Sequence, residues 1–156
     1  MKPASISQIK EELNVLPQKE VVALCLRLAK YKKENKELLA YLLFDAHDVE
    51  GYLETIKKEM NDAFWNLPRH NWYFYKKGLR KILRDIQKHG KHIGTKEAQV
   101  EMLLHFCENM KNSDMHFQQH TAVNNIYIAQ IKKLNMLLEE THEDLQYDYR
   151  KRLNEL

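Results

Sequence analysis

The stretch DVEGYLETIKKEMNDAFWNLP, residues 48–68, decides the fold class. Its apolar side chains recur at intervals of three and four, a period that places them on one face of an α-helix. They are Val49, Tyr52, Leu53, Ile56, Met60, Ala63, Phe64 and Leu67. Asp48 is a suitable N-cap, and Pro68 disfavours helix at the residue before it. The stretch therefore predicts an amphipathic helix that buries one side.

The same period extends along most of the chain, and strict alternation of apolar and polar residues is absent. We expect further helices over Ser5 or Ser7 to Asn14, Pro17–Lys33, Lys36–Ala46 capped by Asn35, Asn71 to about His89 with a stop at Gly90, and Thr95 to about Met110. Residues 113–156 form either one long helix or two, with a possible break near Thr141. The prediction is an all-α compact bundle of about six or seven antiparallel helices in a single domain, residues 1–156.

Residues 36–46 are apolar on most sides, which predicts a position at the centre of the domain. We expect the most buried residues to include Leu42, Leu43, Phe44, Leu83, Leu103 and Phe106. Residues 37–44 (ELLAYLLF) and 99–106 (QVEMLLHF) share a pattern. This similarity allows HEAT-like helical hairpins, and a plain irregular bundle is the alternative.

Composition narrows the class of protein. Of 156 residues, 44% are hydrophobic and 30% are charged, which is typical of a globular chain. Charges near the N-terminus argue against a secretory signal, and no apolar run reaches the length of a membrane span. Cys25 and Cys107 each lie in an apolar helical pattern, which suits small core side chains in a reducing compartment. We therefore expect a cytoplasmic protein with no membrane partner.

Two segments carry a resemblance to known sequences: LRLAKYKKENKELLAYLLF at residues 26–44 and HEDLQYDY at residues 142–149. They resemble an uncharacterised family of bacterial all-helical proteins. The resemblance implies no known activity.

The expected helix over residues 76–91 is strongly basic. Between Arg69 and Lys96 there are nine basic residues and one acid, Asp85, so this segment carries +8 while the whole chain carries +3 and the remainder −5. Helical spacing places Lys77, Arg80, Lys81, Arg84 and Lys88 on one face, with Lys91 beyond them and Trp72 and Tyr73 before them. Basic side chains beside aromatic rings can bind a nucleic acid, with phosphates on the cations and bases on the rings.

Three other interpretations of the basic helix remain open. The charges can be a solvated face, or they can bind an acidic protein. They can also dock on the acidic residues near the C-terminus, which are Glu139, Glu140, Glu143, Asp144 and Asp148.

The histidines raise a metal hypothesis. His116 and His120 have the i, i+4 spacing that can share a metal on one helix face, and with His47 they resemble the ligand set of DinB-like four-helix metal proteins. We expect His47 to lie apart from the other two, so no metal or other cofactor is predicted. His142 lies on an apolar stripe and is expected in the core, whereas Glu101, His105 and Glu108 are expected to face solvent.

No catalytic, phosphate-loop or metalloprotease motif is present. The favoured interpretation is a non-enzymatic helical interaction or scaffold module with a protein partner. The first alternative is phosphate-backbone binding through residues 76–91. The second is a metal-binding bundle that uses His47, His116 and His120.

Overall fold

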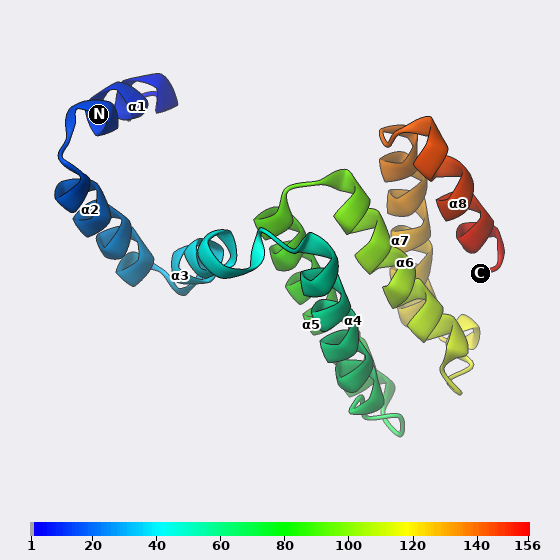
Figure 1. The fold of residues 1–156 in the computed structure, drawn as a ribbon. Coiled ribbons are helices and arrows are strands. Elements are labelled where there is room, and N and C mark those ends of the chain that lie inside the picture. Colours follow the sequence, from blue (N-terminus) through cyan, green and yellow to red (C-terminus); the bar gives the residue numbers. More distant parts are fainter. Residues whose placement is uncertain (1) are drawn as a thin grey trace. The chain divides into compact units, whose positions relative to one another are not determined.

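The computed structural model describes residues 2–156, and all of its regular secondary structure is helical (Figure 1). The elements are α1 (Ile6–Val15), α2 (Gln18–Tyr31), α3 (Lys33–Ala40), a π-helical turn η1 (Tyr41–Asp45), α4 (Val49–Trp65), α5 (Trp72–Ile93), α6 (Lys96–Asn112), a 3₁₀ turn η2 (Phe117–Gln119), α7 (Thr121–Glu139) and α8 (Glu143–Asn154). The all-α prediction is confirmed, with eight α-helices where about six or seven were expected.

The chain divides into two compact units, one that ends at Asp45 and one that begins at Ala46. The prediction of a single domain over residues 1–156 stays a prediction.

The N-terminal unit contains α1, α2, α3 and η1. The predicted capping box at α1 is confirmed: the Ser5 hydroxyl accepts from the Gln8 amide at 3.3 Å, and the Gln8 side chain accepts from the Ser5 amide at 2.9 Å. Asn35 does not cap α3, which begins two residues earlier. Its side chain instead donates to the Leu28 carbonyl at 2.9 Å and so ties α3 to the end of α2.

The prediction that residues 36–46 lie at the centre of the domain is wrong. Leu42, Leu43 and Phe44 are 56%, 64% and 68% exposed. Among residues 2–45 only Tyr41 is buried, because α2 and α3 cover little of the apolar surface that η1 presents. An all-round apolar pattern buries a helix only where neighbours exist on every side.

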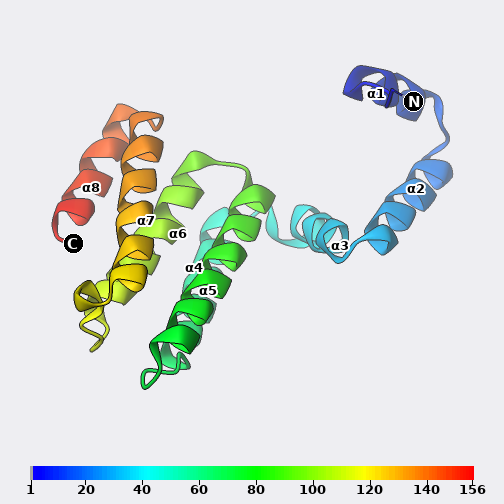
Figure 2. The ribbon, with the colours of Figure 1, turned by 180° about the vertical axis from the view of Figure 1, so that it is seen from behind.

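The C-terminal unit is built around α6, which packs against α4, α5, α7 and α8 (Figure 2). Its eight buried side chains lie all round the helix: Ala98, Val100, Met102, Leu103, Leu104, Phe106, Cys107 and Met110. All of them except Ala98 join one core with buried residues of α4, α5 and α7. The predicted burial of Leu83, Leu103 and Phe106 is confirmed.

Capping residues mark the ends of the helices in the C-terminal unit. The Asp48, Asn71 and Thr95 side chains accept from backbone amides at the starts of α4, α5 and α6, as predicted. Helix α5 does not stop at Gly90, which is buried inside it, and ends instead at Gly94 with a left-handed φ of 78°. A break at Thr141 separates α7 from α8, and the Thr141 hydroxyl donates to the Leu138 carbonyl at 2.9 Å.

Residues 37–44 and 99–106 differ in the structure. Residues 37–44 continue from α3 into the π-helical turn η1, whereas residues 99–106 lie in the buried helix α6. The HEAT-like interpretation stays a prediction. Across residues 2–156, no helix combines the length and apolar content that a membrane crossing requires.

Candidate functional site

The exposed side of α5 carries the cations predicted from the sequence. Lys77, Arg80, Lys81, Arg84 and Lys91 are exposed, and Lys88 is half-buried. We call these six residues the basic face. The opposite side of α5 is buried at Tyr75, Leu79, Ile82, Leu83 and Ile86 and packs on α4, α6 and α7. The packed core therefore fixes the direction in which the basic face points.

Carboxylates do not neutralise the outer part of this face. In the part of the chain that the structure describes, Lys77, Arg80, Lys81 and Arg84 form no ion pair and no side-chain hydrogen bond. Of the acidic residues near the C-terminus, Glu140 pairs with Lys96 at the start of α6. Helix α8, which carries Glu143, Asp144 and Asp148, packs on α6 and α7. The acidic residues therefore leave the basic face open.

The aromatic residues at the start of α5 separate into two groups. Tyr73 and Phe74 are 62% and 51% exposed and meet edge to face at 5.2 Å between ring centroids. Trp72 is half-buried and stacks on His120, with 4.7 Å between centroids and 19° between the ring planes. Helical spacing puts Tyr73 on the basic face, whereas Trp72 lies toward the core. Of the two predicted aromatic contacts, only Tyr73 belongs to this surface.

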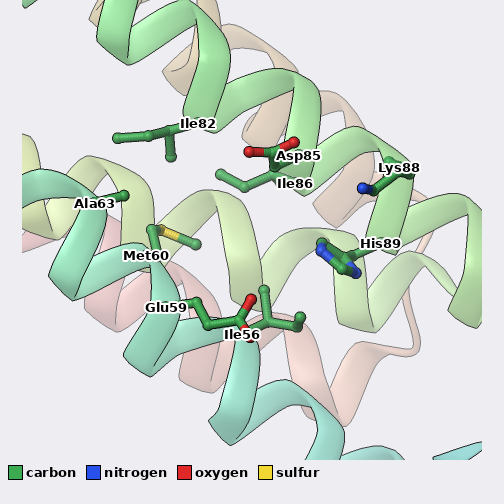
Figure 3. Close-up of a pocket in the computed structure, with 9 residues that line it drawn as sticks. All are labelled: Ile56, Glu59, Met60, Ala63, Ile82, Asp85, Ile86, Lys88 and His89. Atoms are coloured by element: carbon green, nitrogen blue, oxygen red, sulfur yellow. The ribbon is translucent and has the colours of Figure 1, made fainter. Parts of the chain in front are cut away.

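A hollow of about 200 Å³ lies between α4 and α5 on another side of the basic helix (Figure 3). Its lining includes Glu59 from α4 and Asp85, Lys88 and His89 from α5, over a floor of isoleucine and methionine side chains. His89 Nδ1 is hydrogen-bonded to the Tyr52 hydroxyl at 2.7 Å. Two carboxylates make this hollow unfavourable for an anion.

An ionic cluster joins α4, α6 and α8, and sequence reasoning missed it. Arg152 donates to Glu101 at 3.0 Å and to Glu108 at 2.9 to 3.1 Å, and Lys57 lies 3.2 Å from Glu101. The prediction that Glu101, His105 and Glu108 simply face solvent is wrong, because Arg152 covers the two carboxylates and all three side chains are half-buried. The acids repeat at i, i+7 on α6, but no local signal identifies a partner 44 or 51 positions away.

The charged groups of this cluster neutralise one another. Burial by itself would raise the pKa of Glu101, but hydrogen bonds and charge from Arg152 and Lys57 outweigh it and hold that pKa below its ordinary value. Burial lowers the pKa of His105, whose Nε2 lies 2.7 Å from Asn61 Oδ1. Burial and the charge of Glu101 raise the pKa of Tyr149 to about 12. The arrangement fastens α8 to α6.

The three histidines proposed as metal ligands do not converge. His47 precedes α4, whereas His120 stacks on Trp72 at the start of α5. The far end of α4 is linked to the segment before His116, since Arg69 pairs with Asp114 at 3.3 Å. A helix of the length of α4 spans about 25 Å. His116 and His120 also flank the turn η2 and do not share a helix face. The structure therefore does not bring the three histidines together, and residues 2–156 contain no group of three His, Cys, Asp or Glu side chains that could hold a metal ion.

His142 and the two cysteines were also predicted to lie in the core. His142 is an exposed N-cap of α8, where its Nδ1 accepts from the Asp144 amide at 3.3 Å, so its predicted core position is wrong. Cys107 is buried, and burial raises the pKa of its thiol to about 12. Cys25 is exposed, contrary to the expectation of a core side chain.

Comparison with known proteins adds no assignment: no family model, curated protein or solved structure matches this chain. The basic face of α5 is therefore the candidate site on its geometry alone.

Proposed function

We propose that this chain is a helical interaction module whose basic face binds the phosphate backbone of a nucleic acid. One observation carries the proposal: Lys77, Arg80, Lys81 and Arg84 lie exposed on one side of α5, and within residues 2–156 none of them pairs with a carboxylate. Such cations gain by neutralising phosphates, because each contact releases counterions condensed on the nucleic acid.

The packing of α5 supports the same proposal. Since its opposite side is buried at six positions, the helix backbone that carries the row of cations is held in place before any ligand arrives. The row from Lys77 to Lys91 is about 21 Å long at the rise of an α-helix. With about 3.4 Å between nucleotides on one strand, this length corresponds to about six nucleotides.

An acidic protein is less well matched to this surface. Protein interfaces usually have an apolar centre surrounded by polar residues. On α5 the exposed apolar rings, Tyr73 and Phe74, lie at one end of the row, and the middle of the row is charged. A surface of this kind suits a charged polymer that follows the helix.

The experiment is oligonucleotide binding by fluorescence anisotropy, with single strands and duplexes, at about 50 mM salt. The wild type should bind, and Arg80→Glu with Arg84→Glu should abolish binding while circular dichroism shows unchanged helicity. The matched control is Arg150→Glu with Lys151→Glu, which makes the same charge change on exposed positions of α8. Absence of wild-type binding, or equal binding of polyglutamate, would contradict the proposal.

A protein partner is the second candidate, and a separate observation favours it. The N-terminal unit exposes apolar side chains along its helices, including Ile6 (81%), Leu28 (61%) and Phe44 (68%). Exposed apolar patches often mark protein interfaces. In the purified chain we expect rapid amide hydrogen exchange in α1–α3, because almost no side chain there is buried. Protection equal to that of α6 would contradict this candidate.

A cytoplasmic location is part of the proposal. Cys25 and Cys107 are both free thiols, and a reducing compartment would keep the exposed one reduced.

A further inference from the structure

A second hollow, of about 420 Å³, opens between α5, α6 and α7. It is lined by Ile86, Gln87 and Lys91 of α5, Gln99 and Leu103 of α6, and Lys133 of α7. Lys91 also belongs to the basic face, so the hollow continues that surface at its C-terminal end. Its volume lies within the range of small-molecule sites.

The polar groups around this hollow are free to bind a ligand. Among residues 2–156, the side-chain amides of Gln87 and Gln99 make no hydrogen bond, and the ammonium groups of Lys91 and Lys133 make no ion pair. No acidic residue contributes to the lining. Two cations, two amides and an apolar floor of Ile86 and Leu103 therefore face one space.

A glycine allows α6 to approach α5 at this point. A Cβ placed on Gly90 would lie 3.0 Å from Cγ of Gln99 and 3.5 Å from Cε of Met102. The absence of that Cβ lets the Gln99 side chain lie against the α5 backbone. Gly90 is buried there, which explains why glycine occupies this helix position without ending the helix.

The two hollows beside α5 differ in the charge they tolerate. The one shared with α4 contains Glu59 and Asp85, which repel an anion (Figure 3). The one shared with α6 and α7 contains only cationic, amide and apolar side chains. Although Lys88 and His89 also line the α4–α5 hollow, the α5–α6–α7 hollow is the better match for an anionic ligand because no carboxylate lines it.

We propose that this hollow takes one unpaired nucleotide of a single-stranded nucleic acid. Lys91 and Lys133 would bind its phosphate, the amides of Gln87 and Gln99 would hydrogen-bond the base edge, and Ile86 and Leu103 would contact the base face. The assignment rests on the proposed function, because the shared Lys91 makes the hollow an extension of the phosphate-binding row. A base paired in a duplex cannot enter it.

Tyr73 supports a single-stranded ligand at the other end of the row. Its ring is 62% exposed and lies on the same side of α5 as Lys91, about 27 Å away at the rise of an α-helix. Unpaired bases stack on aromatic rings of this kind regardless of sequence. The base faces of a duplex are covered by their neighbours.

The test compares three probes: an oligothymidylate strand of about 12 nucleotides, the corresponding duplex with oligoadenylate, and adenosine monophosphate. Gln99→Ala with Lys133→Ala should weaken strand binding about tenfold and leave duplex binding within about twofold. Tyr73→Ala should also weaken strand binding about tenfold. The controls are Lys132→Ala, an exposed neighbour on α7, and Tyr147→Ala, a 75% exposed ring on α8.

Each result has a separate meaning. Equal losses for strand and duplex, or no loss for either, would overturn the single-strand assignment and leave phosphate binding by the basic face intact. Mononucleotide binding as tight as strand binding would overturn it in favour of a free-nucleotide site. A wild type that binds none of the three probes would overturn the proposed function and this inference together. Circular dichroism of each variant checks that the fold is kept.

Discussion

Arg152 on α8 donates two hydrogen bonds of 3.0 Å to the carboxylate of Glu101 on α6, 51 positions earlier in the chain. The same guanidinium also binds Glu108, two turns further along the same face of α6. These bonds hold α8, which carries three carboxylates and three cations, against α6. Helix α8 and its three carboxylates therefore pack on α6 and α7.

Removing Arg152 should destabilise the C-terminal unit. Arg152→Met leaves two half-buried carboxylates without their shared partner, at an expected cost of about 2 kcal/mol in the free energy of unfolding. Urea denaturation measures it. Adding Glu101→Gln and Glu108→Gln to the same variant should recover part of the loss, since neutral amides need no cation. A variant as stable as the wild type would show that the cluster contributes little.

Acid should weaken the fold in two steps. The pKa values of His105 and Glu101 are both lowered in the folded chain, so the unfolded chain binds protons first as the pH falls. The contribution of His105 to the free energy of unfolding is complete above its ordinary pKa of about 6.5 and is lost as the pH falls below that value. The contribution of Glu101 is complete above its ordinary pKa of about 4.3 and is lost as the pH falls through the lowered pKa of the folded chain.

Urea midpoints measured between about pH 7.5 and 3.5 follow both steps. His105→Gln should flatten the loss between about pH 7 and 5 and keep the loss at lower pH. A wild-type midpoint that stays constant over the whole range would contradict the lowered pKa values.

Two substitutions within α7 should differ in their effect on the free energy of unfolding. Leu134 is fully buried on α7, and Leu134→Ala should lower the free energy of unfolding by about 2 to 5 kcal/mol. Met136, two residues later, is 67% exposed, and Met136→Ala should change it by less than about 0.5 kcal/mol. Similar costs at the two positions would place α7 in a different orientation.

The two thiols should differ in reactivity. Cys25 is exposed, whereas Cys107 is buried with its pKa raised to about 12, so little thiolate forms at neutral pH. A thiol reagent should modify one cysteine quickly and the second only in denaturant. Cys25→Ser identifies the fast site. Rapid modification of both thiols in the folded wild-type chain would contradict the packing of α6.

Helix identity and most helix starts could be predicted from the sequence because both are local. The caps at Ser5, Asp48, Asn71 and Thr95 form as their side chains indicate. Gly90 could not be assigned in this way. A glycine signals a helix end by its backbone freedom, but here its lack of a side chain admits Gln99 from α6.

Burial depended on neighbours that a local pattern does not contain. ELLAYLLF at residues 37–44 and QVEMLLHF at residues 99–106 look alike, yet α6 has four packing partners and Leu43 remains 64% exposed. The basic face was predictable because its spacing is local. Lys133 and Gln99 were not, since only the packing of three helices brings them beside Lys91.

The salt dependence of oligonucleotide binding tests the central claim most directly. If Lys77, Arg80, Lys81 and Arg84 contact phosphates, a plot of log affinity against log salt for a single strand should have a slope of about −3 or steeper, because each contact contributes about −0.7 and Lys91 and Lys133 add to these four. Arg80→Glu with Arg84→Glu should abolish binding, while the α8 control pair should keep the wild-type slope. A flat plot, or a slope unchanged by the α5 substitutions, would contradict phosphate binding by the basic face.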